Sequence, residues 1–196
     1  MLTPASVTPD PSPTQPAAAS IELRALGFTI YDADGEAIAS HEFADDPEPA
    51  IEALTEAFAA DPVLSEVEAD PELCSPEALR AAWGGVELDH GLDIEKLLPP
   101  GQKFGLFVGV DEVNGVSIAS PAGFVPGGTV PAGSEPLAKT LEYEGITYSW
   151  FAYDVAVGED LGPAAHNEFW GAAAYVVDDV IESLFSPRRF YDGEDC

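Results

Sequence analysis

The alternation of hydrophobic and polar residues is clearest in two stretches near the start of the chain. Residues 21–31 and 36–43 carry β-branched and aromatic side chains in a strand-like pattern. Between them, 32–35 (DADG) is a turn sequence in which Gly35 supplies a positive φ. This pattern predicts a β-hairpin.

A helical period replaces the alternation after this hairpin. Apolar residues recur every three or four positions within 47–60, which predicts an amphipathic helix. Asp45 and Asp46 precede Pro47, so we expect an aspartate at the N-cap and a proline in the first turn. Residues 63–67 return to a strand pattern.

Short elements separated by turns fill the middle of the chain. Residues 77–82 predict one helical turn. Asn114-Gly115 is the sharpest turn signal in the chain and predicts a second hairpin. The strands predicted in this region are 83–88, 104–110 and 116–120.

The last third combines a loop with two further hairpins. Residues 121–136 are rich in proline and glycine, so we expect a surface loop there, with a composition that suits a mobile flap. The predicted hairpins are 141–157, turning at Glu144-Gly145, and 168–185, turning at Asp178-Asp179.

Together these elements predict an α+β fold with a mainly antiparallel sheet, built from β-hairpins and one main amphipathic helix. Residues 1–20 are proline-rich and nearly uncharged, so we expect a disordered tether. We expect 21–185 to form a single domain, in which 21–68 and 83–157 resemble two degenerate hairpin–helix half-repeats. Residues 186–196 read as a polar tail.

The charge balance narrows the choice of partners. The chain has 36 acidic and 7 basic residues, a net charge of −29. Such a surface repels nucleic acid and anionic membranes, and it attracts cations and basic proteins. Solubility or adaptation to high salt explains the same composition, so a functional role for the charge stays open.

The cellular location of the protein is inferred from the composition of its first residues and from its hydropathy. No apolar run approaches the roughly 20 residues that span a bilayer. A spacer of proline, serine, threonine and alanine is typical of mature lipoproteins, so we expect an extracellular, membrane-anchored lipoprotein whose signal and lipobox have been removed. The alternative is the cytoplasm of a salt-adapted organism, whose proteins also contain few lysines.

The search for reactive chemistry is mostly negative. Asp32 and Asp34 precede Gly35 as in a calcium loop, but the remaining ligand positions do not fit. Weak calcium binding at Asp45/Asp46 or Asp178/Asp179 stays open, and we expect no other cofactor. Cys74 and Cys196 are equally compatible with a disulfide and with free thiols, and they predict no metal site.

We predict no catalytic residues, because the sequence contains no nucleophile elbow, zinc-binding helix or phosphate loop. The alternative is a hydrolase-type enzyme with a site near His166 and Glu168, covered by the loop 121–136. A calcium-stabilised structural module is a third interpretation.

Aromatic residues supply the best candidate for a binding surface. Alternation places Tyr148 and Trp150 on one face of a strand and Phe151 and Tyr153 on the other. One face belongs to the core, and the other is either core or a platform for a sugar, a peptide or a protein. The candidate binding residues are Tyr148, Trp150, Phe124 and His166.

A family resemblance accompanies these patterns. Its residues are GFTIYDADGEAIASHEFADDPEPAIEALTEAFAADP (27–62), Trp83-Gly84, GVSIASPAGF (115–124) and YVVDDVIESLF (175–185). This texture, which covers most of 21–185, resembles a family of actinobacterial secreted lipoproteins of unknown function. The family supplies no catalytic residues, and 121–136 departs from it where relatives would have a short helix. The hairpin–helix plan is also similar to that of beta-lactamase inhibitor proteins, which are binders.

The sequence therefore predicts a non-enzymatic binding or accessory domain of the cell envelope or of the secreted space. Its expected partner is a protein or an envelope component, and the charge favours a basic one.

Overall fold

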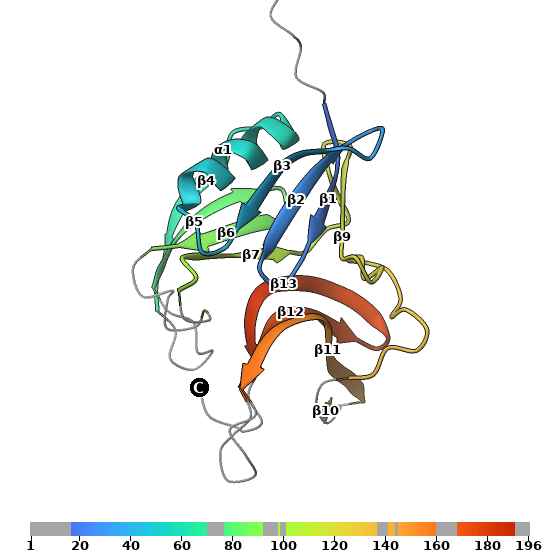
Figure 1. Cartoon of the computed structure of the whole chain (residues 1–196). Helices are drawn as coiled ribbons and strands as arrows, with labels where there is room; N and C mark the ends of the chain where they lie inside the picture. The colour runs from blue at the N-terminus through green and yellow to red at the C-terminus, as the bar shows by residue number, and fades with distance from the viewer. Residues whose placement is uncertain are drawn as a thin grey trace, which may run out of the picture.

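Two β-sheets and one helix make up the described part of the chain (Figure 1). The computed structural model describes residues 17–69, 77–91, 98, 101–136, 141–143, 145–159 and 168–190. In spatial order, the five-stranded sheet consists of β3 (Ala37–Glu42), β2 (Gly27–Asp32), β1 (Ala18–Leu23), β9 (Val116–Ala119) and β8 (Glu112–Val113). The eight-stranded sheet consists of β10 (Leu141–Tyr143), β11 (Ile146–Glu159), β12 (Glu168–Val177), β13 (Val180–Phe190), β7 (Phe104–Val108), β6 (Val86–His90), β5 (Ala78–Trp83) and β4 (Val63–Val67).

The expected fold class, α+β with a mainly antiparallel sheet, is confirmed. Neighbouring strands pair antiparallel except β1 and β9, which pair in parallel with Ile21 opposite Ile118. A parallel pair needs a crossover, and here the whole segment from β2 to β8 provides it. Whether the two half-repeats are related stays a prediction; β9, from the second, lies beside β1, from the first.

The predicted helix is present as α1 (Pro47–Phe58). Asp46 occupies the N-cap in an extended conformation, followed by Pro47 at the start of the helix. Its carboxylate makes no cap hydrogen bond and instead accepts one from the Lys103 ammonium, at 2.6 Å. Three buried side chains, at Ala50, Leu54 and Phe58, form the inner stripe of the helix.

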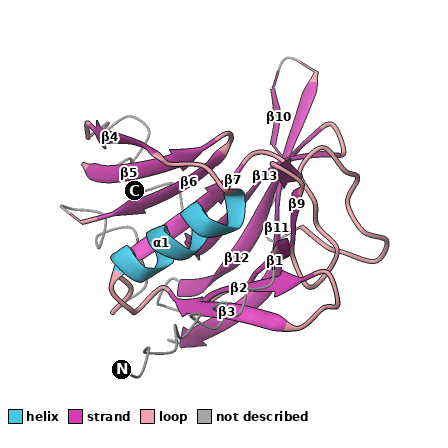
Figure 2. Ribbon diagram, turned by 90° about the horizontal axis from the view of Figure 1, so that it is seen from above, coloured by secondary structure: helices cyan, strands magenta, loops and turns pink. Residues whose placement is uncertain are grey.

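The core lies between the two sheets and under α1, which Figure 2 shows lying over their junction. Phe58 of the helix contacts Trp83 of β5, with ring centroids 6.0 Å apart. Hydrogen bonds of two side chains also join the sheets. The Asp154 carboxylate accepts the Ala25 N–H at 2.9 Å, and the Ser186 hydroxyl donates to the Arg24 carbonyl.

The first predicted strand, 21–31, is wrong as a single element. The chain forms β1, turns at 24–26 and returns as β2, because Arg24 N–H bonds the Gly27 carbonyl. β1 begins at Ala18, so the last residues of the predicted tether belong to a sheet; residues 1–16 lie outside the described part.

Three further elements differ from expectation. The strand predicted for 83–88 is interrupted, because Gly84 and Gly85, both with positive φ, form the turn between β5 and β6. The helical turn predicted for 77–82 is strand β5, because pairing with β4 and β6 outweighs the local helix propensity of its alanines and leucine. β13 continues to Phe190, well into the range expected to be a polar tail, while 191–196 lie outside the described residues. The hairpins at Asp32–Gly35, Gly145 and Asp178-Asp179 are confirmed. The turn at Asn114-Gly115 is also present, but it joins β9 to the short strand β8. The strand expected to precede this turn, 104–110, contains β7, which lies in the other sheet between β6 and β13, so the predicted hairpin of 104–110 with 116–120 is wrong.

Among the described residues, α1 is too short to cross a bilayer, and no other helix is a candidate for a membrane span.

Candidate functional site

A continuous row of aromatic rings crosses one face of the eight-stranded sheet. Tyr148 and Trp150 both lie against Tyr175, with ring centroids 6.3 Å and 4.7 Å apart. Trp150 also contacts Phe185 at 5.5 Å, and Phe185 contacts Phe107 at 4.9 Å. We call these five residues the aromatic row. Every one of them is half-buried, so each ring packs against its neighbours and also exposes part of its surface to solvent.

Strand register brings these rings together. Trp150 of β11 lies directly opposite Tyr175 of β12, and Phe185 of β13 lies directly opposite Phe107 of β7. Directly opposed residues share a face of the sheet, and their side chains are neighbours. The four strands are consecutive in the sheet, so the row spans β11, β12, β13 and β7.

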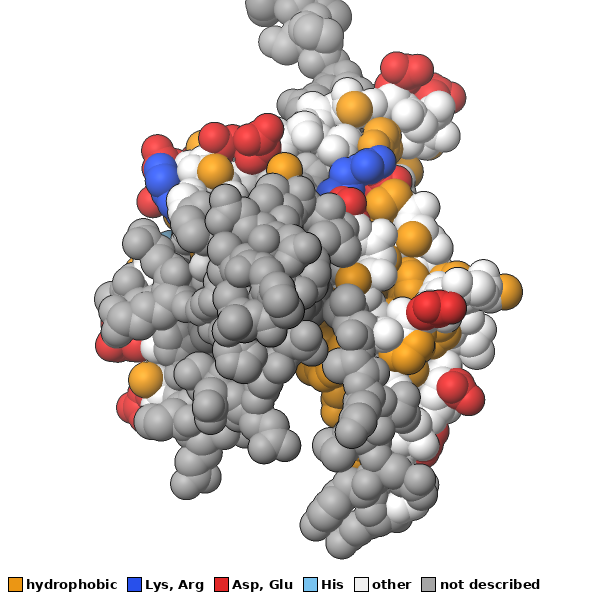
Figure 3. All heavy atoms as spheres, turned by 60° about the horizontal axis from the view of Figure 1, so that its bottom comes forward, with side chains coloured by type: hydrophobic (Ala, Val, Ile, Leu, Met, Phe, Trp, Pro, Cys, Tyr) orange, Lys and Arg blue, Asp and Glu red, His pale blue; other side chains and the backbone are white. Residues whose placement is uncertain are grey.

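Carboxylates flank the aromatic row. Burial raises the pKa of the Tyr175 hydroxyl, and the nearby Tyr148 and Glu182 add to the shift. Asp178 and Asp179, both exposed, form the turn between β12 and β13. Figure 3, which brings the lower side of Figure 1 forward, shows hydrophobic and acidic side chains next to one another on the visible part of the surface.

An ion cluster continues the same face beyond Phe107, which lies opposite Glu87 of β6. Arg80 of β5 donates to both carboxylate oxygens of Asp89, at 2.7 Å and 2.8 Å, and lies 2.6 Å from a Glu87 oxygen. Hydrogen bonding to Asp89 is the main reason that the pKa of Arg80 is raised. This cation is neutralised locally and leaves the face acidic.

Phe124 does not join the aromatic row. Only 2% of it is exposed, and its ring packs on Phe151 and Tyr153 with centroids 6.1 Å and 5.5 Å away, on the opposite face of β11. The Ser120 hydroxyl accepts the Phe124 N–H at 2.9 Å and fixes its backbone. Phe124 is a core residue, so its inclusion as a surface binding residue is wrong.

The loop 121–136 contains no helix, as expected, but its middle is held in place. The Gly127 N–H bonds the Ile181 carbonyl at 2.7 Å, and the Ile181 N–H bonds the Gly128 carbonyl at 2.9 Å. With Phe124 anchored in the core, this loop packs along β13, which is not the arrangement of a mobile flap.

Other predicted site residues fall in different places. His166, Cys74 and Cys196 lie outside the described residues, so their roles stay predictions. Glu168 begins β12.

The acidic turns serve as structural elements. Asp32 accepts the N–H groups of Asp34 and Glu36, which makes it a turn residue. Asp178 accepts the Thr147 N–H at 2.9 Å. Within the described part of the chain, no group of three or more histidine, cysteine, aspartate or glutamate side chains could hold a metal ion.

Sequence reasoning missed Tyr175, Phe185 and Phe107 as members of the row. Alternation within β12 and β13 could have marked the first two as sharing a face, since both hairpin strands were predicted. The irregular register between β12 and β13 could not be predicted from alternation, however. The contact of Phe185 with Phe107 requires β13 to lie beside β7, and this strand order has no local signal either.

Comparisons with protein-family models, with curated proteins and with solved structures give no match to this chain. The resemblance to the actinobacterial lipoprotein family therefore stays a hypothesis.

Proposed function

We propose that the protein is a non-enzymatic binding domain that captures a basic protein or envelope component through the aromatic row. The observation that supports this function is the half-exposed set of stacked rings flanked by carboxylates. Tyrosine, tryptophan and phenylalanine bury large areas at low entropic cost, which makes them the usual anchors of protein interfaces.

The chemistry of the row favours a cationic partner. Arginine and lysine bind the faces of aromatic rings, with about 0.5–1 kcal/mol for an exposed contact and about 2 kcal/mol when it is desolvated. Glu182 lies near Tyr175, and Asp178 accepts the N–H of Thr147, the residue before Tyr148, so both carboxylates add charge attraction at this end of the row. The net charge of −29 steers basic proteins towards the whole surface and repels nucleic acid.

The location is part of the same proposal. The proline-rich start of the sequence and the acidic, lysine-poor composition suit a secreted or envelope-anchored lipoprotein. The cytoplasm of a salt-adapted organism is the alternative. Membrane extraction of the native host protein with detergent, followed by mass spectrometry of its N-terminal peptide, separates the two.

Fluorescence anisotropy with a labelled nona-arginine peptide at 150 mM salt tests the binding surface. Tyr175→Ala in the aromatic row should weaken binding about threefold to tenfold. Tyr31→Ala is the matched control, because Tyr31 is a half-buried tyrosine of β2 in the other sheet. We expect less than a twofold effect from this control, and equal losses in the two variants would contradict the proposal.

A further inference from the structure

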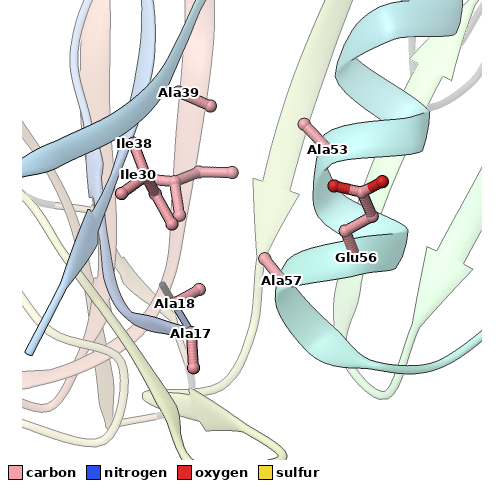
Figure 4. A pocket seen from close by; sticks show the side chains of 8 residues that line it. All are labelled: Ala17, Ala18, Ile30, Ile38, Ala39, Ala53, Glu56 and Ala57. Atoms are coloured by element: carbon pink, nitrogen blue, oxygen red, sulfur yellow. The ribbon is translucent and has the colours of Figure 1, made fainter. Parts of the chain in front are cut away.

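A second, separate feature of the surface is an apolar groove between α1 and the five-stranded sheet (Figure 4). Its volume is about 280 Å³, and seven of its eight lining residues are alanine or isoleucine. Ile38 and Ala39 of β3 and Ile30 of β2 form one wall, and α1 forms the other. The groove opens where β1 begins, at Ala18.

The polar lining residue is an acid. Glu56 stands on α1 between Ala53 and Ala57, which both line the groove, and its side chain is exposed. None of the eight lining residues is basic. No lining residue therefore pairs with the Glu56 carboxylate, which is available to a cation of the ligand.

The end of α1 adds negative potential at the same place. Its last turn contains no basic residue, although the carbonyl end of a helix favours cations. From the described residues, the carbonyls there accept neutral groups alone: the N–H groups of Ala59 and Ala60 and the side-chain amide of Asn114.

Acids of the β2–β3 turn lie beside the groove as well. Asp32 is the strand partner of Ala18, which lines the groove, and exposed Glu36 precedes the lining residue Ile38 by two positions. Negative charge thus surrounds an apolar slot from the helix side and from the sheet side.

We infer that this groove binds a peptide segment in which an aliphatic side chain is followed by lysine or arginine. The aliphatic group would occupy the space between Ile38 and Ala53, and the cation would meet Glu56 and the end of α1. The slot is about twice the size of an engineered 150 Å³ apolar cavity that takes up benzene. It fits one or two side chains, and it is smaller than the usual pocket for a drug-sized molecule.

Methyl NMR of the isoleucines locates the ligand. The probe is a hexapeptide with the sequence Gly-Leu-Lys-Leu-Lys-Gly, and the matched peptides replace both leucines by serine or both lysines by glutamate. The leucine–lysine peptide should shift the Ile38 methyl signal. Ile146, at the turn between β10 and β11 near the aromatic row, should stay unchanged. A shift at Ile146 alone would place the peptide on the aromatic row and overturn the groove, and an Ile38 signal that the leucine–lysine peptide leaves unchanged would do the same.

Two variants with the same net charge separate the groove from the general field. E56Q removes the carboxylate of the lining, and E52Q removes an exposed carboxylate of the same helix that does not line the groove. E56Q should weaken the leucine–lysine peptide about threefold to fivefold. E52Q should change the affinity for this peptide by less than about 1.5-fold. Equal effects of the two variants would mean that the peptide is attracted by the overall negative charge and not by the groove, which would refute the inference.

Because the two surfaces have different reporters, their outcomes are independent. Tyr175→Ala leaves the Ile38 response unchanged if the groove is a separate site, and E56Q leaves nona-arginine binding to the aromatic row within twofold.

Discussion

Replacing Tyr153 by phenylalanine should make the protein more stable. The Tyr153 hydroxyl is buried and, among the described residues, has no hydrogen-bond partner, while its ring stacks on Phe124 with centroids 5.5 Å apart. A buried hydroxyl without a partner costs about 1–3 kcal/mol of folding free energy. The substitution keeps the ring contact and removes only this cost. Loss of the oxygen's dispersion contacts offsets part of the gain, so we expect about 1 kcal/mol of added stability.

The effect of Tyr153→Phe should grow at alkaline pH. Burial raises the pKa of Tyr153 well above its ordinary value, with a smaller contribution from Asp154. In the unfolded chain the phenol ionises near pH 10, so above that pH the unfolded state binds fewer protons than the folded state. The stability linked to this tyrosine is therefore complete below about pH 10 and is lost as the pH rises towards the folded pKa. The phenylalanine variant escapes that loss.

Urea unfolding followed by tryptophan fluorescence measures both effects, at pH 7 and at pH 10.5. The variant should gain about 1 kcal/mol at pH 7, or a Tm higher by about 2–4 °C. Its advantage over the parent protein should widen at pH 10.5. Tyr31→Phe is the control, and we expect its free energy of unfolding to stay within about 0.5 kcal/mol. A loss of stability in Tyr153→Phe would mean that the hydroxyl makes a favourable hydrogen bond, and the reasoning would fail.

Four further substitutions test how the fold is held, each by urea unfolding. Gly27→Ala should cost about 3 kcal/mol, since a Cβ there would lie 2.1 Å from the His41 carbonyl oxygen; Gly35→Ala, with φ +80° and open space, should cost only about 1–2 kcal/mol. Phe124→Ala truncates a core side chain and should cost about 3–5 kcal/mol of unfolding free energy. A loss under about 1 kcal/mol would contradict the assignment of Phe124 to the core. Asn114→Ala removes a residue suited to its φ of +50° and also the 2.8 Å hydrogen bond that its side-chain amide donates to the last carbonyl of α1, and should cost about 1–2 kcal/mol.

Local signals were enough to predict the elements that depend on neighbouring residues. The proline and aspartates before α1, and its apolar period, fix the helix within two residues of its observed end. Asn114, Asp178 and Asp179 all adopt positive φ, as tight hairpin turns require, and these turns were found. Such turns are closed by the residues that the sequence places next to each other.

Elements that depend on distant partners were not predictable in the same way. Residues 78–83 (ALRAAW) have helix-forming composition, and only the strands on both sides of them impose the β conformation. The turn at 24–26 lacks a proline or an Asn-Gly pair, so 21–31 looked like one strand. Pairing of β1 with β9 joins segments almost 100 residues apart, and no local pattern encodes it.

The candidate site likewise has a part that local sequence patterns predicted and a part that depends on distant partners. Alternation alone put Tyr148 and Trp150 on a common face, which the structure confirms. Phe124 carried no signal of its own, because an aromatic residue in a proline-glycine loop reads as exposed unless the strands beneath it are known. The groove beside α1 combines residues from three strands and a helix and emerges only from their packing.

The position of β1 between β2 and β9 has a consequence during synthesis. When the first three strands and the helix have left the ribosome, the inner edge of β1 still awaits Val116–Ala119. The nascent chain must therefore carry an open, partly apolar edge until Val116–Ala119 has been translated, an interval in which a chaperone or a second nascent chain can occupy it. Slowing translation upstream of β9 should lower the yield of soluble protein, whereas slowing it after β9 should have little effect.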